Sequence, residues 1–214
     1  MGGVPAPADR GRGPSLGPKV GVIALQGAFA EHAAALDALG AHAVLVRDPG
    51  ALAGVDAIVL PGGESTTMSL LLGSSGLDGA LAERLGAGTP AFGTCAGLIL
   101  LARDVTDGRP DQRSFGVLDV SVARNGYGRQ RESFEAAGTA HLDTKPVRLE
   151  MVFIRAPRIR RVGPDVQVLA EHGGEPVMAR QDRVLVATFH PELTETTTVH
   201  QYFCDLVRRS RIAA

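Results

Sequence analysis

Residues 19–40 read KVGVIALQGAFAEHAAALDALG, and this stretch sets the expected fold. Its first part is a short apolar run, rich in Val and Ile, that ends at a glycine, which is typical of a buried strand. In its second part, apolar residues recur at helical spacing until another glycine ends the pattern. They are Phe29, Ala33, Leu36 and Leu39. The stretch therefore predicts a strand followed at once by a helix.

The alternation of strand and helix continues through the first half of the chain. Strand-like apolar runs occupy residues 41–46, 55–60 and 90–94. Helical patterns occupy residues 65–73, opened by Ser65, and residues 76–86. Buried strands that alternate with helices predict a doubly wound sheet, in which ligands bind at the carboxyl ends of the strands.

The pattern changes after Arg103 to short, Val-rich runs separated by turn residues. Such runs are typical of antiparallel strands and hairpins, and a last helix is expected at residues 196–210. We therefore predict an α/β fold with a doubly wound, mostly parallel sheet flanked by helices. Antiparallel strands are expected to extend this sheet in the C-terminal half.

Length and composition predict one globular domain with a short tail. The chain has 214 residues, of which 44% are hydrophobic, so it can bury one sizeable core. Residues 1–18 are dominated by Gly, Pro and Ala and cannot form a packed element. We expect a disordered tail over residues 1–18 and a single domain over residues 19–214.

Charge and cysteine content argue against several classes of protein. The formal net charge of -1 disfavours broad binding to nucleic acid or anionic membranes, which requires a concentrated basic surface. The most basic stretch, RIRR at residues 158–161, is expected to be a solvated turn. The sequence has two distant cysteines and no apolar leader or membrane-length run, which favours the cytoplasm.

One of the two cysteines, Cys95, lies where the strand PAFGT runs into the helical pattern CAGLILLA. Gly93, Ala96 and Gly97 supply the small side chains that a sharp turn from strand to helix needs. At such a turn the unpaired helix amides favour a thiolate nucleophile, although a lone cysteine is also a common buried residue. The other cysteine, Cys204, lies among apolar residues of the last helix and is expected in the core.

A histidine and a carboxylate follow the last strand-like run. His190 and Glu192 are two residues apart in TFHPEL, so in an extended backbone both face the same side. The histidine can then transfer a proton while the carboxylate orients its ring. An isolated HxE is more often a strand-end histidine beside an exposed glutamate, so this pair needs a nucleophile.

A pair of glycines follows a third strand, in VLPGGES at residues 59–65. Backbone amides of Gly62 and Gly63 can point into a cavity and hold an oxyanion, although Pro-Gly-Gly is also a common turn. Nucleophile, base and oxyanion loop thus each follow a different predicted parallel strand. Together they predict acyl transfer or hydrolysis of an amide or ester through a thioester.

These residues resemble those of class I glutamine amidotransferases, which carry GTCAG and a downstream HPE. Further segments are similar to the glutaminase subunit of pyridoxal 5'-phosphate synthase: ALQGAFAEH, LPGGEST, RNGYGRQ followed by SFE, and FIRAP. The resemblance runs from about residue 19 to the last helix and implies the flavodoxin-like architecture of that family. Gly126 and Thr188 depart from it, since alanine is usual at both positions.

The resemblance implies roles for individual residues. Cys95 is implied as the nucleophile, His190 as general base and acid, and Glu192 as the partner of that histidine. L-Glutamine is expected to bind at Gly63, Glu64, Ser65, Arg124, Ile154 and Arg155. Arg124 and Arg155 suit the substrate carboxylate and Glu64 its ammonium group, although a surface charge is the ordinary reading of either arginine.

The resemblance also implies partners. Ammonia is expected to pass to a (β/α)8-barrel synthase subunit, in a large hetero-oligomer that makes pyridoxal 5'-phosphate. Gln26, after the first strand, is expected to report docking of that partner to the oxyanion loop. No cofactor and no metal are expected, and the histidines His32, His42 and His141 show no ligand spacing.

Two alternatives remain open at this stage. One is a glutaminase subunit of another amidotransferase, such as the imidazole-ring-forming synthase of histidine biosynthesis. The other is a non-catalytic regulatory domain that keeps the fold without the chemistry.

Overall fold

The structure is a computed structural model that describes residues 17–109, 111–124, 126, 133–143 and 145–212. The predicted disordered tail lies outside the described residues except for its last two positions. In chain order the elements are β1 (Lys19–Ile23), α1 (Phe29–Ala38), β2 (His42–Val46), α2 (Pro49–Leu52), β3 (Ala57–Leu60), α3 (Ser65–Ser74), α4 (Leu77–Gly86), β4 (Ala91–Thr94), α5 (Ala96–Leu101), β5 (Ala102–Val105), β6 (Leu118–Ala123), β7 (Ser133–Leu142), β8 (Lys145–Ile154), β9 (Arg158–Val162), β10 (Gln167–His172), β11 (Glu175–Gln181), β12 (Val184–Ala187), the 3-10 turn η1 (Pro191–Leu193) and α6 (Thr198–Ile212).

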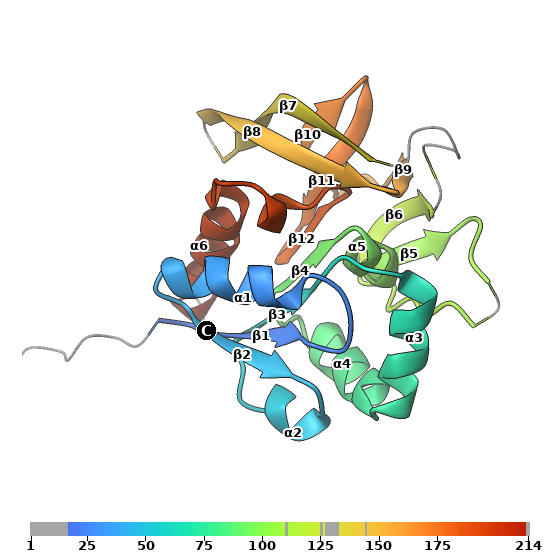
Figure 1. Cartoon of the computed structure of the whole chain (residues 1–214), viewed down its shortest axis with the longest axis vertical. Helices are drawn as coiled ribbons and strands as arrows, with labels where there is room; N and C mark the ends of the chain where they lie inside the picture. The colour runs from blue at the N-terminus through green and yellow to red at the C-terminus, as the bar shows by residue number, and fades with distance from the viewer. Residues whose placement is uncertain (1–16, 110, 125, 127–132, 144, 213–214) are drawn as a thin grey trace, which may run out of the picture.

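A sheet of nine strands runs through the molecule in the order β2-β1-β3-β4-β12-β11-β10-β7-β8 (Figure 1). The pairings from β2 to β12 are parallel, and those from β12 to β8 are antiparallel. The predicted doubly wound α/β fold with antiparallel strands in the C-terminal half is therefore confirmed. The sheet is more evenly mixed than expected, because β7 and β8 add a long hairpin to it.

Each face of the parallel part of the sheet buries its own core, as the two-residue period of a strand requires. In β1, Val20 and Val22 point to the face covered by α1 and α6, while Ile23 points to the opposite face. That second face is covered by α2, α3, α4 and α5 (Figure 1). The continuous apolar strands of the sequence are thus buried on both sides, which is typical of parallel sheets.

The expectation of a solvated turn at residues 158–161 is wrong. These residues belong to β9, which pairs antiparallel with β6 in a second sheet of order β5-β6-β9. Ile159 is buried between arginines, and Arg161 lies 2.7 Å from Asp119 and 3.3 Å from Asp104. Because carboxylates neutralise the outward arginines, the basic run is compatible with a strand.

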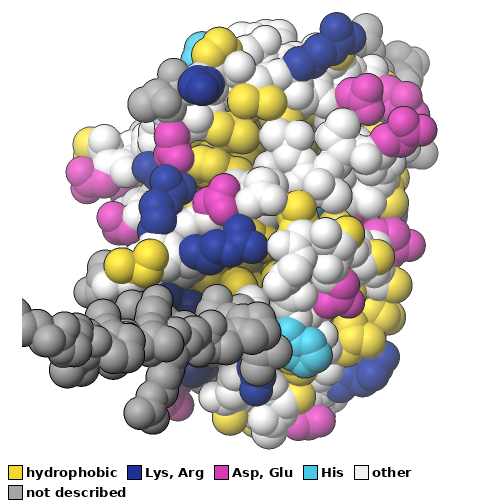
Figure 2. Space-filling view, turned by 90° about the vertical axis from the view of Figure 1, so that its left-hand side faces the viewer, with side chains coloured by type: hydrophobic (Ala, Val, Ile, Leu, Met, Phe, Trp, Pro, Cys, Tyr) yellow, Lys and Arg dark blue, Asp and Glu magenta, His cyan; other side chains and the backbone are white. Residues whose placement is uncertain are grey.

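Charges of both signs are also mixed elsewhere on the surface. On the face in Figure 2, Lys and Arg side chains alternate with Asp and Glu, and neither sign covers a wide area of it. None of the helices in the described ranges is long and apolar enough to cross a bilayer.

Candidate active site

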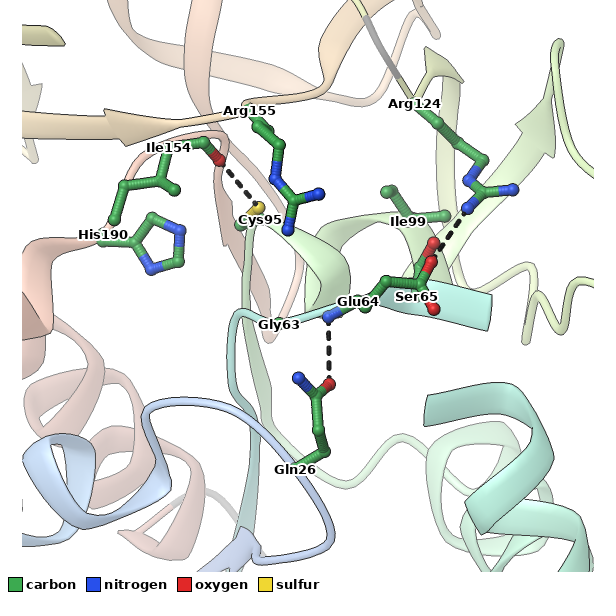
Figure 3. A pocket seen from close by; sticks show the side chains of 10 residues that line it. All are labelled: Gln26, Gly63, Glu64, Ser65, Cys95, Ile99, Arg124, Ile154, Arg155 and His190. Atoms are coloured by element: carbon green, nitrogen blue, oxygen red, sulfur yellow. Dashed lines mark hydrogen bonds and ion pairs between the residues drawn. The ribbon is translucent and has the colours of Figure 1, made fainter. Parts of the chain in front are cut away.

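The residues singled out from the sequence meet at one end of the sheet. A cavity of about 170 Å³ opens where β1, β3, β4, β8 and β12 end (Figure 3). Its lining includes every predicted glutamine-binding residue, together with Cys95, His190 and Gln26. The lining residues are Gln26, Gly63, Glu64, Ser65, Cys95, Ile99, Arg124, Ile154, Arg155 and His190.

Cys95 occupies the sharp turn between β4 and α5. Its backbone adopts φ 47° and ψ -101°, a left-handed conformation that a residue with a side chain rarely takes. The amide of Cys95 donates to the Ala187 carbonyl of β12 at 2.9 Å, and its Sγ lies 3.8 Å from the Ile154 carbonyl oxygen. The strained turn therefore presents the thiol to the cavity from a fixed backbone.

The glycines around this cysteine are required by close backbone contacts. A Cβ atom added to Gly97 would lie 1.9 Å from the Leu60 carbonyl oxygen, so α5 packs directly on the end of β3. A Cβ atom added to Gly93 would lie 2.6 Å from the carbonyl carbon of Gly97. Small residues are thus needed on both sides of the nucleophile turn, as the sequence predicted.

His190 and Glu192 form a buried pair behind the thiol. His190 Nδ1 lies 2.7 Å from Glu192 Oε1, and the Glu192 side chain has no exposed surface. Burial alone would lower the pKa of His190, but hydrogen bonds to Cys95 and Glu192 outweigh it and raise this pKa to about 10. Because Glu192 engages Nδ1, Nε2 is the ring nitrogen left for Cys95. The arrangement places an imidazolium directly beside the Cys95 thiol.

The loop after β3 packs closely on two of these side chains. A Cβ atom at Gly62 would lie 2.2 Å from His190 Cε1, and one at Gly63 would lie 2.4 Å from Gln26 Oε1. Gln26 Oε1 also accepts a hydrogen bond from the Glu64 amide at 2.9 Å. Gln26 therefore contacts the predicted oxyanion loop directly, although its role in partner docking stays a prediction.

Glu64 already has partners in this structure. Its carboxylate caps α3 by accepting from the amides of Thr66 and Thr67, at 3.0 and 2.6 Å. Burial raises the pKa of Glu64, but the hydrogen bonds from Thr67 and Thr66 together outweigh it and lower this pKa to about 2. Arg124 Nη2 lies 3.1 Å from Glu64 Oε1 and 2.8 Å from Thr66 Oγ1. The ionised Glu64 thus holds Arg124 at the cavity wall.

The other predicted binding residues lie around the same opening. The Arg155 guanidinium extends beside Cys95 from the end of β8, and its backbone has φ 44° (Figure 3). Ile154 presents its carbonyl to the thiol. The Ser65 hydroxyl donates to Gln112 Oε1 at 3.0 Å and is 4% exposed, so its side chain is engaged outside the cavity. Of the segment RNGYGRQ, only Arg124 and Gly126 lie within the described residues.

Two histidines that the sequence did not connect with the site stand behind Glu192. His32 of α1 lies 3.3 Å from Glu192 Oε2 through its Nε2, and 2.9 Å from His200 Nε2 through its Nδ1. Both rings are fully buried. The sequence does contain one indication that His32 is buried, because it lies one turn before Leu36 on the apolar face of its helix. In the described ranges no group of three or more His, Cys, Asp and Glu residues could hold a metal ion.

Known proteins similar to the chain agree in family and fold. The model of the SNO glutamine amidotransferase family matches residues 22–209. Pyridoxal 5'-phosphate synthase subunit PdxT of Mycobacteroides abscessus is 51% identical over 193 residues, covering 90% of this chain and 99% of that relative. The subunit of the same name from Acidothermus cellulolyticus is 52% identical over 200 residues, covering 91% and 96%.

Solved structures give the same result. One described as a glutamine amidotransferase matches with a TM-score of 0.81 and 46% identity, over 88% of this chain and 98% of that one. A putative GMP synthase component from Thermoplasma acidophilum matches with a TM-score of 0.66 over 92% and 96% of the two chains. Its identity is 17%, so it supports the fold alone.

Proposed function

The chain belongs to the SNO glutamine amidotransferase family, and on this premise we propose that it hydrolyses L-glutamine to L-glutamate and ammonia for pyridoxal 5'-phosphate synthesis. One observation carries the proposal: the thiol of Cys95, the His190 ring and the Glu192 carboxylate follow one another from the wall of a small cavity inward. The cavity is also lined by the residues that the family resemblance assigns to glutamine.

The first half of the reaction forms a thioester. The Cys95 thiolate attacks the side-chain amide carbon of glutamine, and the new C–S bond pushes charge onto the carbonyl oxygen. Backbone amides of the Gly62–Gly63 loop hold this oxyanion. His190 then gives its Nε2 proton to the amide nitrogen, the C–N bond breaks, and ammonia leaves. The raised pKa of His190, about 10, keeps this proton available at neutral pH.

The second half restores the enzyme. His190, now neutral, takes a proton from a water molecule that attacks the thioester carbon. The C–S bond breaks, glutamate leaves, and the proton on His190 again faces a thiolate. The Glu192 carboxylate stabilises the imidazolium in both halves.

Two arginines and one glutamate suit recognition of a free amino acid. Arg155 reaches into the cavity, where its guanidinium can pair with the substrate carboxylate. Glu64 faces Arg124 in this structure, so an incoming ammonium group has to share or replace that ion pair. Gly63, Ser65 and Ile154 complete the pocket mainly through their backbone groups. An Arg155→Met exchange is therefore expected to raise KM for glutamine more than it lowers kcat.

The ammonia produced needs an acceptor. We propose that it is a synthase subunit with a (β/α)8 barrel, joined with this chain in a large hetero-oligomer, and that the reaction takes place in the cytoplasm. Residues 19–214 act as a single glutaminase domain in this proposal. The Gly62–Gly63 loop is held by Gln26, so a partner that moves Gln26 would move the oxyanion amides. Gln26→Ala should then lose the stimulation of ammonia release by the partner.

The test is ammonia release from glutamine by the full chain, alone and with candidate synthase subunits. We expect strong stimulation by the synthase subunit for pyridoxal 5'-phosphate and none by the imidazole-ring-forming synthase of histidine biosynthesis. The reverse preference would assign the chain to that other amidotransferase. Equal release by Cys95→Ala in the stimulated complex would refute the mechanism, and no release with any partner would favour a regulatory domain.

A further inference from the structure

The close polar contacts of the site continue past Glu192 into the core. Glu192 Oε1 meets His190, while Oε2 lies 3.3 Å from His32 Nε2 and makes no hydrogen bond with the described residues. His32 Nδ1 lies 2.9 Å from His200 Nε2, and Thr94 Oγ1 lies 3.1 Å from His32 Nε2. Neither histidine lines the cavity, so neither can contact the substrate.

The arrangement of protons along this chain follows from its contacts. Two neutral imidazole nitrogens 2.9 Å apart need one donor and one acceptor. If His32 carried its proton on Nδ1, its bare Nε2 would face the Glu192 carboxylate, and two acceptors would repel each other. His200 would then hold its proton on Nδ1, which is buried and has no partner in the described part of the chain. Such an unpaired buried donor is costly.

The opposite order leaves no donor of the two rings unpaired. His200 Nε2 donates to His32 Nδ1, and the proton on His32 Nε2 lies between Thr94 Oγ1, 3.1 Å away and in hydrogen-bond geometry, and Glu192 Oε2, 3.3 Å away. The Thr94 hydroxyl can accept or donate beside this contact. What stays unsatisfied among the described atoms of the two rings is an acceptor lone pair on His200 Nδ1.

Both histidines also remain uncharged. Burial, together with the nearby His200 and His190, lowers the pKa of His32 well below its usual value, and burial lowers that of His200 to about 4. A neutral His32 holds Glu192 without cancelling its charge, so the full negative charge acts on the His190 imidazolium. A cation at this position would compete with His190 for the carboxylate.

We propose that His32, oriented by His200, is a positioning residue for the triad. It keeps a polarised N–H beside the second oxygen of Glu192 and so favours the plane of the carboxylate that orients His190. The carboxylate lies between two rings: His190 is hydrogen-bonded to Oε1 at 2.7 Å, and His32 Nε2 lies 3.3 Å from Oε2. The positions of the protons on His32 and His200 do not depend on which reaction the chain catalyses. Only their effect on ammonia release rests on the proposed function.

The first test reads the protons directly. In the full chain labelled with 15N-histidine, two-bond 1H–15N spectra distinguish the two neutral tautomers and the charged ring. We expect His32 and His200 as neutral rings protonated on Nε2 between pH 7.5 and 5.5, assigned by the loss of each signal in His32→Gln and His200→Gln. A His32 ring protonated on Nδ1, or charged at pH 7, would overturn the proposal.

The second test compares His32→Gln with His32→Asn. The amide of Gln reaches about as far as Nε2 and can still place an N–H beside Glu192, whereas the amide of Asn reaches only as far as Nδ1. The readout is the rate of Cys95 alkylation by iodoacetamide from pH 5 to 9, followed by peptide mass spectrometry. Cys204 does not interfere, because burial raises its pKa to about 11.

We expect His32→Asn to slow Cys95 alkylation at pH 6.5 by about tenfold, equivalent to one pH unit in the thiolate–imidazolium equilibrium. His32→Gln should retain most of the wild-type rate, and His141→Gln, at an exposed site on β7, should change nothing. Equal rates in the Asn and Gln variants, both folded by circular dichroism, would contradict the proposal. Since alkylation needs no glutamine, this outcome is separate from failure of the proposed reaction.

Discussion

Burial of His200 should make the stability of the fold depend on pH between 7 and 5, and His200→Gln should remove that part of the dependence. The ring is fully buried on α6, and burial lowers its pKa to about 4 from the ordinary 6.5. Folding therefore favours the neutral ring. The stability that this ring contributes is present above pH 6.5 and is lost as the pH falls from 6.5 toward 4, because only the unfolded chain takes up the proton.

The size of the effect follows from the same shift. At pH 5 the His200 ring is protonated in the unfolded chain and neutral in the folded chain. The free energy of unfolding is therefore about 2 kcal/mol lower at pH 5 than at pH 7, at about 1.36 kcal/mol per pH unit. His190 acts in the opposite direction, because its raised pKa gives stability that is full below pH 6.5 and is lost as the pH rises through about 10. It is present in wild type and variant alike, so its effect cancels in the comparison.

Urea unfolding at pH 7, 6 and 5 measures this difference. Gln is neutral throughout this range, and its amide can still donate to His32 Nδ1. Between pH 7 and 5 we expect the free energy of unfolding of His200→Gln to fall by about 2 kcal/mol less than that of the wild type. His141→Gln, at an exposed position, should follow the wild-type curve. Parallel curves for the wild type and His200→Gln would refute the reasoning.

Three further substitutions, one of them with a matched control, test the packing and the chemistry around the site. Gly97→Ala should destabilise the chain by more than about 2 kcal/mol in urea unfolding, because its Cβ would meet the Leu60 carbonyl; Gly79→Ala, in an exposed and open place on α4, should instead stabilise by about 0.5–1 kcal/mol. Thr188→Val should raise the free energy of unfolding by about 1 kcal/mol, because the buried Thr188 hydroxyl has no partner in the described part of the chain; a loss of stability would mean that the hydroxyl has a partner. Cys95→Ser should lower partner-stimulated ammonia release by at least about 10³-fold with unchanged unfolding; near-normal release would exclude the thiol as nucleophile.

The sequence predicted the elements whose patterns are local and missed those that depend on a partner. The parallel strands can be predicted from their continuous apolar runs, and the turn at Cys95 from the glycines beside it. β7 reads SFEAAGTAHL, which has few β-branched residues, and its strand depends on ten paired positions with β8. The arginines around Ile159 lead the sequence to predict a turn at β9, whereas the carboxylates of distant Asp104 and Asp119 make a strand acceptable there.

The same distinction explains which site residues could be predicted. Cys95 and His190 follow neighbouring strands whose register pairs Thr94 with Ala187, and the Cys95 amide donates to the Ala187 carbonyl. Backbone pairing therefore sets the spacing of nucleophile and base. It is enough to know which strand a residue follows to place that residue in the site. The histidines behind Glu192 have no such register. They come from α1 and α6, which are 168 residues apart at His32 and His200, and only helix packing brings them together.

This difference bears on how the site tolerates change. The sheet fixes Cys95 and His190 through many backbone bonds, so a single side-chain substitution elsewhere leaves their spacing intact. Glu192 lies beyond the strand in the short turn η1, so no strand register fixes its carboxylate. A buried imidazole must stay neutral, yet its N–H can lie beside the carboxylate without cancelling its charge. The part of the triad with the least backbone support is thus the part that the two core histidines hold.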